Sequence, residues 1–167
     1  FIRIDPEGAT TLVMPQVEMG QGIYTAISMI LAEELDADWS KVQLLHAPAN
    51  EKLYGNPIFI IQATGGSTSV RAFWKPLREA GASARAMLVQ AAAAQWNVDP
   101  ASCTTSKGEV THKASGRTLS YGALAAAARR TRRESLSERR RTAVAHAPAR
   151  GGKHEVPRTA ARPTARY

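Results

Sequence analysis

Apolar and polar residues alternate at the start of the chain. Phe1-Ile2-Arg3-Ile4 has the two-residue period of a half-buried strand, and Thr11–Met14 is a second β-prone run. The intervening Asp5-Pro6-Glu7-Gly8 is a typical turn sequence. The pattern therefore predicts an N-terminal β-hairpin.

A helical period begins after the turn Gly20-Gln21-Gly22. Apolar residues then recur every three or four positions, as on the buried face of an amphipathic helix. The predicted helix runs from Ile23 to Leu35, and its apolar face consists of Ile23, Ile27, Ile30, Leu31 and Leu35. Val42, Leu44 and His46 predict a third strand. The predicted order is strand, glycine-rich turn, helix, strand.

Residues 47–63 contain proline, asparagine and glycine at short intervals, which predicts a loop. The segment Thr64–Ser69 introduces a long predicted helix over Val70–Trp96, with Ser67 or Ser69 as its N-cap. Pro76 is expected to kink or break this helix near its second turn. Past the proline, a stripe of small residues should let another element pack closely: Ala80, Ala84, Met87, Ala91 and Ala92.

Shorter elements follow the long helix. Strands are expected over Ala101–Thr105, Glu109–His112 and Arg117–Leu119, and Ser120 should cap a last helix over Tyr121–Ala128. The expected fold is α+β, with a small mixed sheet and two main helices in one domain over residues 1–128. No apolar run reaches the ~18 residues that a membrane-spanning helix needs, so no membrane span is expected.

Charge divides the chain into two parts. Residues 1–128 hold 10 Lys and Arg against 11 Asp and Glu, whereas residues 129–167 hold 12 against 3. The arginine-rich tail has too few large apolar residues to offset its ordering entropy, so we expect it to be disordered. Three explanations of the tail remain: an arm for nucleic acid or an acidic partner, a solvated terminus, or a translation out of frame.

Cysteine and histidine usage excludes several function classes. Cys103 is the only cysteine, which excludes an internal disulfide framework and a cysteine-rich metal site. The four histidines lack the spacing of a zinc enzyme. The chain starts at Phe1 within a strand-like sequence, which suggests a removed leader or an internal piece of a longer protein.

Two glycine-rich turns carry the candidate chemistry, because each lies where a helix begins. A helix N-terminus offers free backbone amides and the positive end of the helix dipole. Gln21 adds a carboxamide that can donate and accept hydrogen bonds, and the hydroxyls of Thr64–Ser69 could surround a phosphate. Ordinary turns with N-caps are the alternative reading, since neither segment is a complete nucleotide-binding motif.

The motifs that carry a family resemblance are spread over nearly all of residues 1–128. They are Val17–Gly22, Thr25, Ala32–Leu35, Ala47-Pro48, Asn56-Pro57, Thr64–Arg71, Leu77–Ala82, Ala84–Leu88, Ser115–Arg117 and Tyr121-Gly122. In this order they resemble the molybdopterin-binding large subunit of the xanthine dehydrogenase/aldehyde oxidase family. Within this family the sequence most resembles the two-subunit branch that is typified by isoquinoline 1-oxidoreductase beta subunits. It resembles an N-terminal fragment of such a subunit.

The resemblance implies a cofactor and a set of contacts. The cofactor would be molybdopterin cytosine dinucleotide, with Gln21 on the pterin and Thr64–Ser69 against the dinucleotide and its phosphates. Family enzymes hydroxylate a heterocycle or an aldehyde with oxygen from water and pass electrons to two [2Fe-2S] clusters on a small partner subunit. The implied cofactor-binding residues are Gly20, Gln21, Gly22, Thr64, Gly65, Gly66, Ser67, Thr68 and Ser69.

The resemblance also implies what this sequence lacks. The catalytic glutamate of the family lies in a Gly-Glu-Pro-like motif that is absent here, so we expect no catalytic residue and no activity from the chain alone. The remaining domains of the large subunit would be needed. The alternatives are a small basic protein that binds nucleic acid through its tail, and a packing element without a ligand of its own.

Several other residues are predicted to have structural rather than functional roles. Glu18 and His46 are expected to be structural rather than catalytic, and Cys103 to be a small core residue. Trp74 and Trp96 are expected to pack on the long helix, and Arg71 either meets a cofactor phosphate or is solvated.

Overall fold

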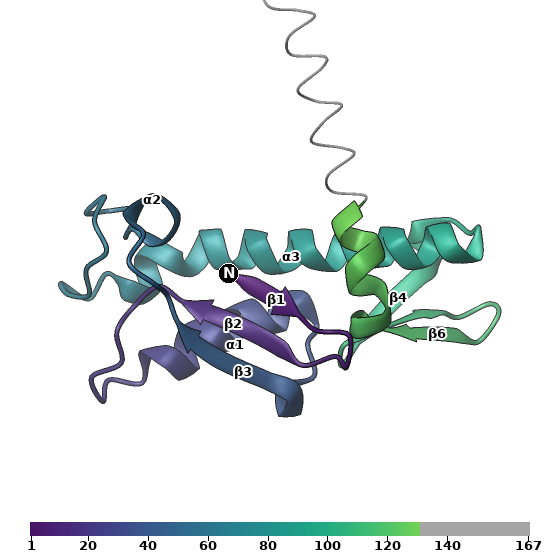
Figure 1. Cartoon of the computed structure of the whole chain (residues 1–167), viewed down its shortest axis with the longest axis horizontal. Coiled ribbons are helices and arrows are strands. Elements are labelled where there is room, and N and C mark those ends of the chain that lie inside the picture. Colours follow the sequence, from purple (N-terminus) through teal and green to yellow (C-terminus); the bar gives the residue numbers. More distant parts are fainter. Residues whose placement is uncertain (131–167) are drawn as a thin grey trace, which may run out of the picture.

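Two three-stranded sheets and two long helices form the part of the chain that the computed structural model describes, residues 1–130 (Figure 1). This α+β arrangement confirms the predicted fold class. The predicted disorder of the arginine-rich tail, residues 129–167, and the three explanations of that tail concern residues that lie outside the described part from position 131 onward. The elements are β1 (Ile2–Ile4), β2 (Thr10–Met14), α1 (Ile23–Leu35), β3 (Val42–His46), α2 (Glu51–Tyr54), α3 (Ser69–Trp96), β4 (Cys103–Ser106), β5 (Glu109–His112) and β6 (Arg117–Ser120).

The first sheet is mixed, as predicted. Strand β1 pairs antiparallel with β2, and β2 pairs parallel with β3, so that β2 lies in the centre. Helix α1 connects the two parallel strands, which makes β2-α1-β3 a crossover unit. Leu12, Val13 and Met14 of β2 are buried, whereas Leu44 and Leu45 of the edge strand β3 are exposed on its two faces.

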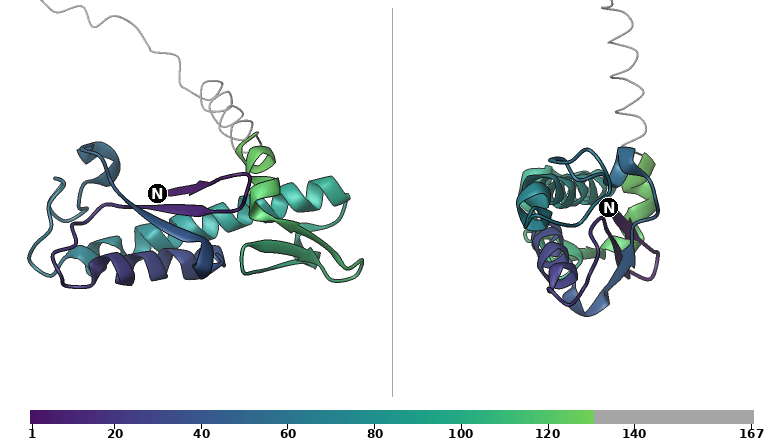
Figure 2. Two further views of the ribbon diagram at one scale, coloured as in Figure 1. Left: turned by 60° about the horizontal axis from the view of Figure 1, so that its bottom comes forward. Right: turned by 90° about the vertical axis from the view of Figure 1, so that its left-hand side faces the viewer.

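Helices α1 and α3 lie side by side on one face of this sheet (Figure 2). Their contact is closest at Gly81. A Cβ at that position would lie 2.8 Å from both the Leu31 carbonyl oxygen and the Glu34 Cβ, so only glycine fits without displacing α1. Leu31 and Leu77 are fully buried in the shared core. Because each helix begins at one of the glycine-rich turns, this packing fixes both turns relative to one another.

Helix α3 is continuous from Ser69 to Trp96, with Pro76 inside it. Of the two effects expected of Pro76, a kink or a break, the continuous helix excludes the break. Phe73 and Leu77, on either side of the proline, are both buried in the same core. The burial of these two side chains offsets the loss of the hydrogen bond that the proline cannot donate. The helix ends at Asn97, which adopts a left-handed conformation with φ 53°.

The last three strands form a second, antiparallel sheet against the C-terminal half of α3. Asp36, the C-cap of α1, connects α1 to α3 and to the second sheet. Its carboxylate accepts hydrogen bonds from Arg85, at 3.0 Å, and from Thr105, and its carbonyl accepts one from the Gly108 amide at 2.7 Å. The second sheet is thus attached to the end of α1 as well as to α3.

The described chain ends in a helical segment, residues 121–130. The Ser120 hydroxyl accepts a hydrogen bond from the Ala123 amide at 3.3 Å, which confirms the predicted cap. The Tyr121 hydroxyl donates to the Leu35 carbonyl at 2.7 Å, and burial raises the pKa of this phenol. Helical structure continues to Arg130, two residues beyond the predicted end. Within residues 1–130, no helix is long and apolar enough to cross a membrane.

Candidate functional site

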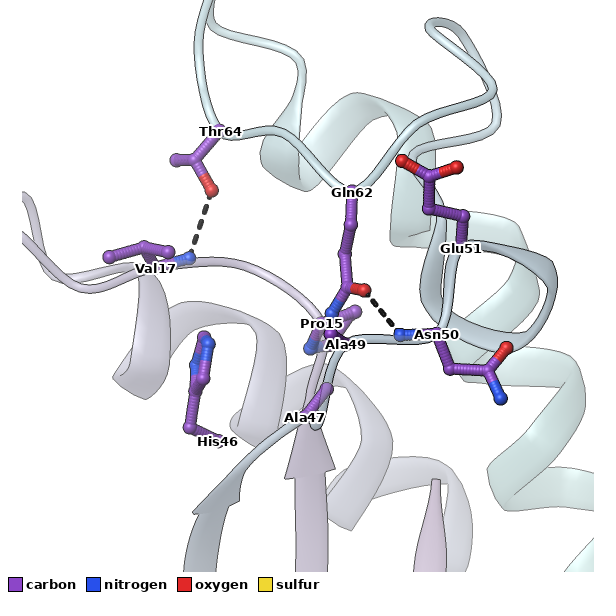
Figure 3. Close-up of a pocket in the computed structure, with 9 residues that line it drawn as sticks. All are labelled: Pro15, Val17, His46, Ala47, Ala49, Asn50, Glu51, Gln62 and Thr64. Atoms are coloured by element: carbon purple, nitrogen blue, oxygen red, sulfur yellow. Dashed lines mark hydrogen bonds between the residues drawn. The ribbon is translucent and has the colours of Figure 1, made fainter.

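A hollow of about 660 Å³ lies at the carboxyl ends of the parallel strands β2 and β3 (Figure 3). Ligands of sheets with parallel strands commonly bind at this edge, where loops leave the strands. The segment after β2, the segment after β3 and the approach to α3 meet there. The lining residues are Pro15, Val17, His46, Ala47, Ala49, Asn50, Glu51, Gln62 and Thr64.

Two hydrogen bonds join the residues just before the first glycine-rich turn to the second turn, although some 45 residues separate the two turns along the chain. The Val17 amide donates to the Thr64 hydroxyl oxygen at 2.9 Å (Figure 3). The Ser69 hydroxyl donates to the side-chain oxygen of Gln16 at 2.8 Å, and Gln16 is fully buried. The structure therefore brings the two predicted segments together at one end of the molecule.

The start of α1 is occupied by a side chain of the same turn. The Glu18 carboxylate accepts hydrogen bonds from the amides of Gly20, Gly22 and Tyr24 at 2.7, 3.0 and 3.0 Å. These bonds hold the pKa of Glu18 below its ordinary value, and the bond from the Tyr24 amide lowers it most. The structural reading of Glu18 is thus supported. The amides of Gly20 and Gly22 are not free for a ligand.

Gln21 lies exposed at the tip of this turn. Its side-chain oxygen accepts from the Met19 amide at 2.5 Å, and its side-chain nitrogen donates to the Val17 carbonyl at 2.8 Å. A carboxamide has two donor hydrogens and two acceptor lone pairs. Gln21 therefore retains one donor and one acceptor for an outside group. Gly20 and Gly22 have φ of +92° and +78°, which only glycine adopts readily.

The second turn is held by its hydroxyl groups. Thr68 is buried; its hydroxyl donates to the Gly65 carbonyl and accepts from the Asn56 side-chain nitrogen, both at 2.8 Å. Thr68 is also the N-cap residue of α3, so the prediction of Ser67 or Ser69 is wrong. Ser69 is instead the first helical residue, and its hydroxyl is used by the contact with Gln16.

The exposed part of this turn is Gly65–Ser67. Gly66 and Ser67 have φ of +58° and +51°, and a Cβ on Gly65 would meet no atom within 4 Å. Three successive residues thus present their backbone to solvent beside the hollow. Of the nine predicted contact residues, only Thr64 lines the hollow itself.

Two structural features of the candidate site were missed from the sequence. Asn56 is fully buried and anchors the loop before the second turn. Asn56-Pro57 was one of the motifs of the resemblance, but its role depends on a contact that no local pattern reveals. The second feature is a pair: the Tyr24 hydroxyl lies 2.7 Å from His46 Nδ1, and the rings stack at 6.2 Å. His46 therefore reaches the hollow in a fixed orientation.

The tryptophans behave differently from one another. Trp96 packs against the core, as predicted. Trp74 is 49% exposed, with the Arg78 guanidinium 5.1 Å from its ring, so its assignment as a packing residue is wrong. Cys103 packs partly buried against the core, and Arg71 is exposed in the first turn of α3.

The exposed groups suit a large, hydrogen-bonding ligand. Gly20, Gly22 and Gly65 have open space where a side chain would be, so a flat molecule can approach the backbone closely. The lining of the hollow contains no lysine or arginine and includes Glu51, so a phosphate there would depend on backbone amides. Among residues 1–130, no cluster of three His, Cys, Asp or Glu could hold a metal ion. The open backbone at the three glycines fits a planar pterin cofactor.

Comparison with known proteins decides the family. Residues 1–161 match the family model of the molybdopterin cofactor-binding domain. The chain belongs to this family. The match extends into the arginine-rich tail, beyond the segment that carries the sequence motifs.

Relatives place this molybdopterin cofactor-binding domain more narrowly. It is 43% identical over 127 residues to isoquinoline 1-oxidoreductase subunit beta of Brevundimonas diminuta, covering 75% of the chain and 16% of that protein. It is 37% identical over 126 residues to the membrane-bound aldehyde dehydrogenase [pyrroloquinoline-quinone] of Gluconacetobacter polyoxogenes, covering 75% of the chain and 15% of that protein. The predicted membership in the xanthine dehydrogenase/aldehyde oxidase family is thereby confirmed.

A solved structure supports the fold. CO dehydrogenase from Oligotropha carboxidovorans matches with a TM-score of 0.57 and 22% identity, over 74% of this chain and 15% of that one. The domain thus spans about one sixth of the length of the proteins that it matches.

Proposed function

We propose that this domain provides part of the binding site for molybdopterin cytosine dinucleotide in the large subunit of a molybdenum hydroxylase. The observation that carries the proposal is the link between the segment that leads into the first glycine-rich turn and the second turn, through the Val17–Thr64 and Gln16–Ser69 hydrogen bonds. This contact places an exposed carboxamide and an exposed run of backbone at one end of the molecule. Family membership supports a pterin as the ligand.

The described residues divide the work of binding. Gln21 offers one donor and one acceptor to the pterin edge, while Glu18 keeps the turn below it in shape. The exposed backbone of Gly65–Ser67 would bind the dinucleotide phosphates, and the Thr68 hydroxyl holds that turn through its hydrogen bond to the Gly65 carbonyl. Thr64 joins the two contact regions. When bound, the cofactor supplies the redox chemistry that hydroxylates a heterocyclic or aldehyde carbon with oxygen from water.

Partners complete the enzyme in this proposal. A small subunit with [2Fe-2S] clusters would accept the electrons, and the other domains of the large subunit would supply the catalytic glutamate. The 167 residues contain no Gly-Glu-Pro motif, which supports inactivity of the chain alone. No residue of the chain is therefore assigned a catalytic role.

The test uses a chimera in which residues 1–128 replace the matching segment of the Brevundimonas diminuta beta subunit, co-expressed with its partner subunit. Molybdenum per protein and cytidine monophosphate released by acid hydrolysis are measured. Gln21→Ala removes two hydrogen-bonding groups of about 1 kcal/mol each, so we expect the affinity for the cofactor to fall roughly thirtyfold, and molybdenum occupancy to fall with it when cofactor is limiting. Gln90→Ala, an exposed residue of α3, is the control and should change nothing.

Two results would contradict the proposal. Unchanged molybdenum content in the Gln21→Ala chimera would show that Gln21 does not contribute to cofactor binding. Release of a nucleotide other than cytidine monophosphate, or of none, would exclude the cytosine dinucleotide. Both readouts are independent of substrate turnover.

A further inference from the structure

Four consecutive apolar residues are exposed in the loop between α2 and the second turn. Ile58, Phe59, Ile60 and Ile61 are 47, 41, 81 and 50% exposed; we term them the apolar loop. Leu53 of α2 is 61% exposed and belongs to the same connection between β3 and α3. A run of this kind on a folded surface marks an interaction site, because exposed apolar segments otherwise promote aggregation.

The apolar loop is built as a defined turn on Asn56. The Asn56 carbonyl accepts from the amides of Phe59 and Ile60 at 3.1 and 2.7 Å, and its side-chain oxygen accepts from the Ile58 amide at 2.9 Å. The Asn56 amide donates to the Ile61 carbonyl at 2.8 Å. Asn56 is itself fully buried. The loop is thus fixed from below.

Ile60 adopts an unfavourable backbone conformation. Its φ of +63° is in the left-handed region, which a β-branched residue avoids and which glycine or asparagine accepts more readily. The same residue has the most exposed large apolar side chain among residues 1–130. A strained and exposed isoleucine does not stabilise the isolated domain. Its side chain is therefore expected to contact a surface outside the described residues.

We propose that the apolar loop, together with Leu53, is a docking surface for the remaining domains of the large subunit. The inference rests on the proposed function. The matched relatives are about six times as long as the segment they share with this chain, so most of their polypeptide lies outside it. The loop carries no charge, as is typical of permanent rather than transient interfaces.

The docking surface is continuous with the candidate site. The Phe59 ring comes within 3.5 Å of where a Cβ on Gly66 would lie, and the Asn56 side chain bonds Thr68. A domain seated on the apolar loop therefore borders the exposed Gly65–Ser67 backbone. The second wall of the cofactor site would come from that domain.

Hydroxyl-radical footprinting tests the docking surface directly. The 167-residue chain and the chimera described above are labelled in parallel, both prepared without molybdate. We expect Leu53 and residues 58–61 to be labelled several-fold more slowly in the chimera. Met29, which is 54% exposed on α1, is the reference residue and should react equally in both. Equal labelling of the apolar loop in the two proteins would overturn the proposal. Protection of the loop in the 167-residue chain that increases with protein concentration would also overturn it, because a second copy of the chain would then cover the surface.

A substitution separates an interface role from a structural one. Ile60→Asn relieves the backbone strain and replaces an exposed apolar side chain, so the isolated chain should unfold at an equal or higher denaturant concentration. In the chimera it should restore loop labelling several-fold and lower the yield of soluble subunit, while Met29→Asn should do neither. Loss of stability in the isolated chain, or a chimera indifferent to Ile60→Asn, would refute the docking role. Because no cofactor is present, failure here is distinct from failure of the cofactor assignment.

Discussion

Replacement of Gly81 by alanine measures how much the contact between α1 and α3 contributes. Alanine in a helix interior is favoured over glycine by about 1 kcal/mol. Here the added methyl would lie 2.8 Å from the Leu31 carbonyl oxygen and the Glu34 Cβ and 3.2 Å from the Leu35 amide nitrogen. Two of these atoms belong to the backbone and cannot rotate away.

Overpacking of this kind costs about 1–3 kcal/mol, because the two helices must separate by several tenths of an ångström. Because one of the 2.8 Å approaches is to a backbone oxygen, the cost lies in the upper part of this range, at about 2–3 kcal/mol. It exceeds the propensity gain, so Gly81→Ala should lower the free energy of unfolding by about 1–2 kcal/mol. Urea unfolding followed by tryptophan fluorescence provides the measurement. Ser83→Ala, exposed two residues later, is the control and should stabilise slightly. A Gly81→Ala chain as stable as the parent would refute the close packing of α1 and α3.

Two further predictions concern the polar contacts beneath the turns. Asn56→Ala should lower the free energy of unfolding by about 2–4 kcal/mol, because it leaves the Thr68 hydroxyl and the Ile58 amide without their side-chain partner. A double-mutant cycle with Thr68→Val should give a coupling energy of about 1 kcal/mol, and a coupling of zero would exclude the direct bond. Folding lowers the pKa of Glu18, so its stabilisation is present above its unfolded pKa, near 4.5, and is lost as pH falls through the folded value. Unfolding curves of Glu18→Gln and the parent should therefore differ at pH 7 and converge in acid; a pH-independent difference would contradict this role.

Local periodicity explains which elements were predictable. The helix Ile23–Leu35 was predicted with the observed bounds because its apolar residues recur at the helical period and glycine precedes it. Helix α2 was missed within the predicted loop, since its four residues are too few to establish a period. The strands after α3 were recognised, but their separation into a second sheet depends on pairing rather than on composition.

Contacts between distant residues explain what the sequence left undetermined. The hydroxyl of Ser69 bonds to Gln16, 53 residues earlier, so a local N-cap rule assigned it wrongly. The continuity of α3 through Pro76 follows from the burial of Phe73 and Leu77 against a core that the helix sequence alone does not describe. The glycine-rich turns were found, but not that Glu18 fills the start of α1.

The edge strand β3 has a consequence for biosynthesis. Within the described residues it pairs only with β2, and Val42-Gln43-Leu44-Leu45-His46 contains none of the lysines, glutamates or prolines that usually discourage strand-to-strand aggregation. On a ribosome, this strand emerges before any polypeptide that follows it in the chain. Until another segment pairs with its free edge, β3 of the nascent protein exposes backbone groups that can pair with a strand of another chain. We therefore expect this fold to depend on chaperones or rapid assembly to avoid aggregation during translation.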